Sequence, residues 1–229
     1  MLLVCQIHIE ITFQMHKFDN LFKQLITEQD QNVHKVGIFP GAFKPPHIGH
    51  YTTAYNACKD NDQVYIFVSE KPRPLSTQNK GSVKDKPDID RYANILKSDK
   101  YTNNLLGVQT AGVARMTSAT AFRSAISIKD KNTVAKNLPD GVDKDKIYQI
   151  LLQSHDIGSP TYGHVSIEQT MQIWALYKPA LMSLTGLSEQ QLVIKTSVPS
   201  PVKDTYDLVD QLNKSEHAAN TSVRLYVGE

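Results

Sequence analysis

The sequence predicts an α/β fold in which helices flank a parallel sheet of about five strands. Short apolar runs rich in β-branched residues alternate with longer segments of helical spacing. The runs are almost continuously apolar, as expected of parallel strands that are buried on both faces. The first two runs are joined by a loop and a helix within about 35 residues, which fits a βαβ unit with its right-handed crossover.

This first βαβ unit comprises a strand, a helix and a second strand. Residues 35–41, KVGIFPG, are predicted to be a buried strand that Pro and Gly close. Helical spacing follows over residues 48–59. Residues 63–69, QVYIFVS, are rich in β-branched and aromatic residues, which favours the second strand.

A main domain over residues 34–229 is expected after an N-terminal extension, residues 1–33. Within the extension, the apolar residues of 18–28 fall on one stripe and predict a short amphipathic helix, whose expected role is packing or a dimer contact. A dimer contact through this helix would make the protein a homo-oligomer. Residues 1–14 are apolar but lack the cationic start of a signal peptide, and they fall short of the ~20 residues that span a bilayer. They are interpreted as a loose leader or an added strand, with Met15 as an alternative start.

The middle of the chain begins with a polar, Pro- and Lys-rich loop over residues 70–87. A helix is predicted at 88–97 and a strand at 105–110, LLGVQT. The next helix is predicted to begin near Ser118, with these side chains facing inward: Ala121, Phe122, Ala125 and Ile126.

The last third of the chain continues the alternation. Asp143 is a plausible N-cap for a helix whose inward residues are Ile147, Ile150 and Leu151, and a polar linker at 153–164 follows. Ser200 and Pro201 have the cap-then-proline order of a helix start. The predicted elements are a helix at 167–182, a strand at 192–198, a helix at 201–213 and a strand at 223–229.

Composition gives broad limits on function. The chain has 229 residues, 40% hydrophobic and 21% charged, which is ordinary for a soluble globular protein. Its formal net charge of +2 offers no support for nucleic-acid binding. Two cysteines, Cys5 and Cys58, provide no disulfide framework, which fits a reducing compartment, and a cytoplasmic protein is expected.

The stretch GAFKPPHIGH, residues 41–50, has the chemistry of a phosphate site. Gly41 and two prolines turn the chain sharply off a strand end, and the helix that follows is expected to point its unpaired N–H groups at a ligand in the same place. His47 and His50 are three residues apart and share one helical face. Gly49 leaves an open wall beside them, and Lys44 adds a mobile cation. In open α/β sheets, ligands bind at the carboxyl ends of the strands, where this loop would lie.

A second polar stretch, TSATAFR, is predicted to start another helix. Ser118 or Thr120 would cap it and offer hydroxyl and N–H groups to an anion. Arg123, one turn further, provides a bidentate fork for phosphate oxygens. Together with the first stretch, these groups suit a triphosphate, whose transfer reactions depend mainly on positioning and charge stabilisation.

Each of these residues has a simpler explanation. His47 and His50 could be surface histidines that cap a helix, or a metal pair, although no further ligand lies at zinc spacing. Helix capping and a solvated arginine would account for the second stretch. His164 lacks a preceding strand and is interpreted as a loop residue.

Four further residues could belong to the site. Lys71 and Arg73 follow the second strand and are weak candidates for substrate binding, with a solvated linker as the alternative. Trp174 and Tyr177 are expected in the core rather than as a platform for a base.

The two stretches match G-x-F-x-P-x-H-x-G-H and S-x-T-x-x-R, and so resemble the HIGH-motif, cytidylyltransferase-like nucleotidyltransferases, most closely those of large tailed phages. The resemblance implies a Rossmann-like sheet of order 3-2-1-4-5. It also implies transfer of a nucleoside monophosphate from CTP or ATP to a small phosphorylated substrate, with release of pyrophosphate. Mg²⁺ would bind through the phosphates. An inactive nucleotide-binding module is the alternative; a tRNA-charging enzyme is disfavoured because no KMSKS-like run appears.

The resemblance also implies residue roles. His47 and His50 would stabilise the reacting α-phosphate, with Lys44 and Arg123 as further catalytic groups. Lys44, Arg123, Ser118 and Thr120 would hold the β- and γ-phosphates. Gly41, Phe43 and Gly49 would shape the nucleotide pocket.

The order of segments differs from that of the family. The block over residues 159–229 resembles what the family places directly after the second strand, so it looks moved from the middle to the end of the chain. The polar linkers 74–83 and 153–164 would then join rearranged pieces. This hypothesis predicts that 223–228 lies beside 36–40, with 105–110 at an edge of the sheet. Pairing of 105–110 with 63–68 would contradict it.

Overall fold

The computed structural model describes residues 33–43, 45–70, 92, 98–113, 119–153 and 165–228. Several predicted features lie outside these ranges: the helix at 18–28, the polar loop at 70–87 beyond Glu70, most of the helix at 88–97, and the linker at 153–164 beyond Gln153.

Five strands form one sheet, in the order β3-β5-β1-β2-β4. Their bounds are β1 His34–Gly41, β2 Gln63–Ser69, β3 Gly107–Val113, β4 Leu192–Ser197 and β5 Thr221–Gly228. The pairings of β1 with β2, β2 with β4 and β3 with β5 are parallel. The predicted α/β fold is therefore confirmed, and β5 lies beside β1 with β3 at the edge, as expected from the hypothesis of a displaced segment.

The strands alternate their side chains between two hydrophobic clusters, one on each face of the sheet. In β1, Ile38 enters one cluster and Phe39 the other. In β5, Leu225 and Tyr226 divide in the same way. Because both faces are buried, nearly every position of these strands is apolar, which is why the sequence shows continuous apolar runs.

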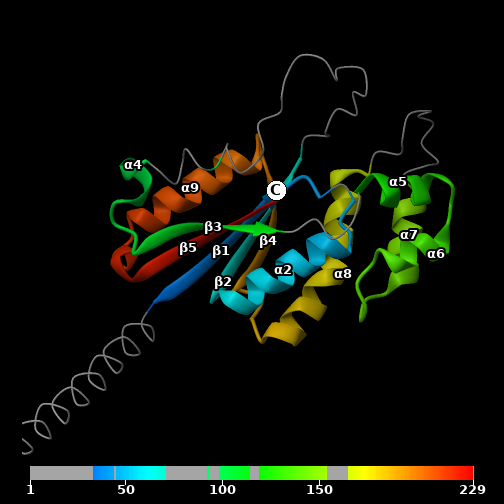
Figure 1. Ribbon diagram of the computed structural model, residues 1–229, viewed down its shortest axis with the longest axis horizontal. Coiled ribbons are helices and arrows are strands. Elements are labelled where there is room, and N and C mark those ends of the chain that lie inside the picture. The colour runs from blue at the N-terminus through cyan, green and yellow to red at the C-terminus, as the bar shows by residue number, and fades with distance from the viewer. Residues whose placement is uncertain are drawn as a thin grey trace, which may run out of the picture. The chain divides into compact units, whose positions relative to one another are not determined.

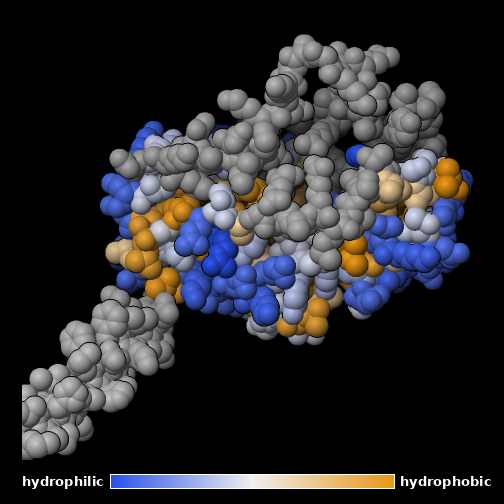
Figure 2. All heavy atoms as spheres, in the orientation of Figure 1, coloured by the Kyte–Doolittle hydropathy of each residue, from blue (hydrophilic) through white to orange (hydrophobic). Residues whose placement is uncertain are grey.

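Helices cover both faces (Figure 1). The larger cluster packs beneath α2 Ile48–Asp60, α5 Ala119–Ser127, α6 Lys131–Lys136, α7 Lys144–Gln153 and α8 Ile167–Thr185. The other cluster is covered by α9 Pro201–Asn213, and Tyr101 of α4 Asp99–Thr102 packs there. On the face drawn in Figure 2, the outer surface around α2 is mostly hydrophilic. Among the residues described, no helix combines the length and apolarity that crossing a membrane requires.

Most predicted bounds agree with the structure to within three residues, and α9 and β2 agree at both ends. The strand predicted at 105–110 is displaced, because β3 runs from Gly107 to Val113. The apolar pair Leu105–Leu106 suggested an earlier start, but Leu105 is buried in a turn and Leu106 is 55% exposed.

Two smaller errors concern helices. Ala121 was predicted to face inward but is exposed, while Phe122, Ala125 and Ile126 are buried as expected. The short helices α4, α6 and the 3₁₀ turn Ala218–Asn220 were not predicted, because they are too short to show a clear periodicity.

A buried polar contact connects β5 to α2. The Asn61 amide donates to the Tyr226 hydroxyl at 2.9 Å and to the Ala57 carbonyl at 2.7 Å. Gly37 makes room for this contact, because a Cβ there would lie 2.9 Å from the Asn61 amide nitrogen. This contact ties β5, an interior strand of the sheet, to the last turn of α2.

Candidate active site

The loop after β1 brings the first predicted motif to the carboxyl edge of the sheet. β1 ends at Gly41, and α2 begins at Ile48. Between them, Phe43 is buried and adopts a positive φ of 48°. The predicted sharp turn is therefore present, and it includes a non-glycine residue in the left-handed region, where backbone strain often marks functional sites.

His47 and His50 form a capping box at the start of α2. The Gly49 N–H donates to Nδ1 of His47 at 3.1 Å, and the His47 N–H donates to Nδ1 of His50 at 3.3 Å. The two imidazoles stack, with ring centroids 3.9 Å apart. The capping role that offered the simpler explanation is therefore real, and it fixes both rings in one orientation.

The backbone N–H groups that begin α2 are already engaged. Ile48 donates to the Asn137 carbonyl at 2.8 Å, and Gly49 donates to His47. The expectation that unpaired N–H groups of this helix would face a ligand is wrong for these residues. The side chains, rather than the helix backbone, carry the donors that remain.

Both histidines are neutral near pH 7. Burial, with a smaller contribution from the Arg123 charge, lowers the pKa of His47 to about 4. Burial, and then the neighbouring His47, lowers the pKa of His50 to about 3. Because each Nδ1 accepts a backbone N–H, each neutral ring carries its proton on Nε2. Among the described residues, none accepts a hydrogen bond from either Nε2.

The second motif meets the first through α5. The Phe122 ring lies edge-on to His47, with centroids 5.9 Å apart. Its neighbour Arg123 is half-buried and close enough to lower the pKa of His47. The structure therefore brings α5 and Arg123 close to the histidine pair, although Arg123 comes more than 70 residues after His50 in the chain.

Several predicted residues fall outside the described part of the chain. They are Lys44, Lys71, Arg73, Ser118 and His164. Thr120 lies in the first turn of α5, but its side chain is not described. Their predicted roles stay predictions. Gly41, Phe43 and Gly49 do lie in the loop and first turn around the histidines, as expected.

A family model described as cytidylyltransferase-like matches residues 38–161, which is more than half of the chain. This chain belongs to the cytidylyltransferase-like family. The matched region includes both histidines and Arg123, whereas β4 and β5 lie beyond it and still complete the sheet. No curated protein and no solved structure matched the chain.

Mg²⁺ is predicted to reach this site together with the nucleotide phosphates. Within the described ranges, no group of three or more His, Cys, Asp or Glu side chains could hold a metal ion. Mg²⁺ commonly binds through substrate phosphates and few protein groups. The binding of Mg²⁺ through nucleotide phosphates stays a prediction.

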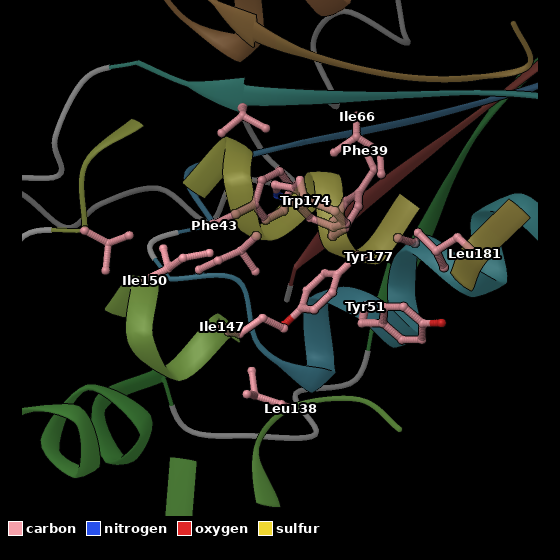
Figure 3. Close-up of a cluster of buried hydrophobic side chains, with 14 of the residues drawn as sticks. Phe39, Phe43, Tyr51, Ile66, Leu138, Ile147, Ile150, Trp174, Tyr177 and Leu181 are labelled. Atoms are coloured by element: carbon pink, nitrogen blue, oxygen red, sulfur yellow. The ribbon is translucent and has the colours of Figure 1, made fainter. Parts of the chain in front are cut away.

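The sequence did not predict that two aromatic side chains of α8 pack beneath the loop that carries the first motif. Trp174 and Tyr177 of α8 are fully buried, as predicted for core residues, and Figure 3 shows them beside Phe43 and Tyr51. The Trp174 ring lies edge-on to Phe43 at 5.4 Å, and the Tyr177 hydroxyl donates to the Pro46 carbonyl at 3.4 Å. Periodicity indicated that these side chains face inward, but could not indicate that they face this loop.

Proposed function

We propose that this chain transfers a nucleoside monophosphate from CTP or ATP to a small phosphorylated substrate and releases pyrophosphate. The observation that carries the proposal is the stacked pair His47 and His50, whose Nδ1 atoms are held by backbone N–H groups while Arg123 lies beside them. Family membership supports nucleotidyl transfer in general. The donor base and the acceptor are the finer parts of the proposal.

In the proposed reaction, an oxygen of the acceptor phosphate attacks the α-phosphorus. The bond from that phosphorus to the bridging oxygen breaks, and pyrophosphate leaves with the electron pair. The Nε2–H groups of His47 and His50 donate to oxygens on which negative charge grows. Since both rings are held before the substrate arrives, little reorganisation is needed at the moment of transfer.

Arg123 supplies positive charge for the β- and γ-phosphates. Lys44, Ser118 and Thr120 are assigned to the same phosphates by their places in the two motifs. Gly41, Phe43 and Gly49 are assigned to the nucleotide pocket. Bound Mg²⁺ would neutralise part of the phosphate charge, and no protein group need hold it directly.

The test is pyrophosphate release from each of the four nucleoside triphosphates with a panel of phosphorylated acceptors. The panel contains nicotinamide mononucleotide, phosphopantetheine, glycerol 3-phosphate and sugar phosphates. Release that depends on both one triphosphate and one acceptor supports the proposal. Tight nucleotide binding without release under any pairing supports the alternative, an inactive nucleotide-binding module.

We also propose that residues 159–229 have moved within the gene from the middle of a phage-type member of this family. The support is the sheet order. In a 3-2-1-4-5 sheet whose strands 1 and 2 are β1 and β2, β4 takes the position of strand 3 and β5 that of strand 4, with β3 as strand 5 at the edge. A variant with this block placed after residue 73 and joined to residue 84 should fold with the same sheet. Failure of that variant to fold, with the parent chain folded, would contradict the proposal.

A further inference from the structure

The indole of Trp174 lies beneath the motif loop with an unused donor. Its side chain is 0% exposed, and Nε1 has no hydrogen-bond partner among the described residues. The ring contacts Phe43 at 5.4 Å and Tyr177 at 5.6 Å between centroids. Figure 3 shows it on α8, next to Phe43 and the strand residue Phe39. A buried N–H without a partner is unfavourable, and such groups often mark a functional site.

The residue that covers Trp174 is itself in an unfavourable conformation. Phe43 has a φ of 48°, a region that L-residues with bulky side chains rarely adopt. Its ring folds over Gly41, where a Cβ would lie 2.6 Å from it. The same ring also contacts His50, with centroids 5.1 Å apart. Phe43 thus lies between the unpaired indole and the histidine pair.

The two sides of the histidine pair differ in chemistry. On the α5 side, Arg123 provides charge, which suits phosphate oxygens. On the α8 side, His50 contacts the uncharged ring of Phe43, which in turn packs on the ring of Trp174. An indole N–H among aromatic rings suits an uncharged, hydrogen-bond-accepting group, such as a carbonyl oxygen or a ring nitrogen.

We propose that Trp174 binds the organic part of a substrate. When that part enters beside His50, the Phe43 ring moves off Trp174 and its backbone leaves the left-handed region. The indole N–H then donates to an acceptor atom of the substrate. Both unfavourable features are relieved by one movement. The acceptor atom belongs either to the base of the nucleoside triphosphate or to the organic portion of the second substrate. The inference rests on the proposed function.

Trp174 is the single tryptophan of the chain, so its fluorescence reports on this position alone. The titration uses the full chain with ATP, CTP, the phosphorylated acceptor panel and inorganic tripolyphosphate. An organic ligand that binds here is expected to change the emission, whereas tripolyphosphate, which has no organic part, is expected to bind without changing it. A response to a nucleotide assigns the base, and a response to an acceptor assigns the second substrate.

Calorimetry with variants provides the second measurement. Trp174→Phe keeps an aromatic ring and removes the N–H, and should weaken the responding ligand about five- to tenfold, the usual effect of one lost hydrogen bond, while tripolyphosphate affinity is unchanged. Tyr51→Phe is the matched control, because the Tyr51 hydroxyl is also buried and has no hydrogen-bond partner in the described part of the chain, but its ring contacts Tyr177 rather than Phe43. It should change neither affinity.

The outcomes separate this inference from the proposed function. If ligands bind but Trp174 emission stays constant, or Trp174→Phe binds the organic ligand as tightly as the parent, the inference is wrong and the proposed function stands. If neither nucleotides nor tripolyphosphate bind the folded chain, the proposed function is wrong, and this inference fails with it.

Discussion

Two helices of this protein begin with the same capping geometry built from different residues. At α2, Nδ1 of His47 accepts from the Gly49 N–H and Nδ1 of His50 accepts from the His47 N–H. At α8, Ser166 Oγ accepts from the Gln169 N–H at 3.2 Å, and Gln169 Oε1 accepts from the Ser166 N–H at 2.9 Å.

The difference lies in what each side chain has left over. The side-chain NH₂ group of Gln169 donates to the Ile150 carbonyl at 2.9 Å. Both polar atoms of the Gln169 side chain are therefore engaged within the fold. Each histidine keeps an Nε2–H that no described residue accepts. Serine and glutamine would satisfy the capping requirement of α2, so capping alone does not explain the histidines. The proposed function assigns a role to their second nitrogen, as a donor to phosphate oxygens.

The most direct test of this difference gives α2 the Ser and Gln cap of α8. The double variant His47→Ser, His50→Gln should keep the helix capped but lose both Nε2 donors, so turnover should fall by about a hundredfold or more. Loss of ring packing should cost only about 1–2 kcal/mol of stability. Pyrophosphate release and urea unfolding measure the two effects, and turnover that survives in the folded variant would refute the role of the histidines.

Arg123→Ala tests whether the α2 cap works with a separate cation. Loss of a charge-assisted hydrogen bond should weaken triphosphate binding about 10- to 100-fold, with a smaller effect on the acceptor. The same change should raise the pKa of His47 in the free protein, because the Arg123 charge helps to lower it. Calorimetry and an NMR pH titration report the two results. Equal losses for both substrates, or an unchanged His47 pKa, would count against this arrangement.

Acid should destabilise the α2 cap but not the α8 cap. In the folded chain the pKa of His47 is about 4, below its ordinary value of 6.5, so below pH 6.5 the unfolded chain binds more protons than the folded one. Stability should therefore fall as pH drops from about 6.5 towards 4, by about 1.4 kcal/mol per pH unit for each such histidine.

His50 should behave in the same way down to about pH 3. Urea unfolding at pH 7.5, 6 and 5 measures the slope in the parent and in the double variant. The difference between the two slopes isolates the histidines from other titrating groups. Parallel slopes would show that the imidazoles are not held neutral by burial.

Ser166→Ala should have the smallest effect. Removing this N-cap should cost about 1 kcal/mol of stability, since one backbone N–H loses its acceptor. Turnover per folded molecule should stay unchanged, because no reacting group is removed. Thermal unfolding measures the stability change, and pyrophosphate release well below the transition temperature measures turnover. A large drop in turnover would show that the N-cap of α8 is coupled to the active site.

Local chemistry explains why much of the fold could be predicted. Ser200 before Pro201 marks the start of α9, and the segment 63–69, rich in β-branched and aromatic residues, coincides with β2 at both ends. Such signals depend on neighbours in the chain. The start of β3 was missed because Leu105 is buried by a turn rather than by the ladder, a distinction that hydrophobicity does not make.

Local signals along the chain predicted the α/β class, most element bounds and the residues of the two motifs, because propensity, capping and periodicity act over a few residues. The place of β5 between β1 and β3 was expected from the family resemblance and is confirmed by the sheet order, whereas only the packed chain shows that Trp174 lies against Phe43 beneath the motif loop. It also decided the charge state of the histidines, since burial sets the pKa and burial is a property of the packed chain.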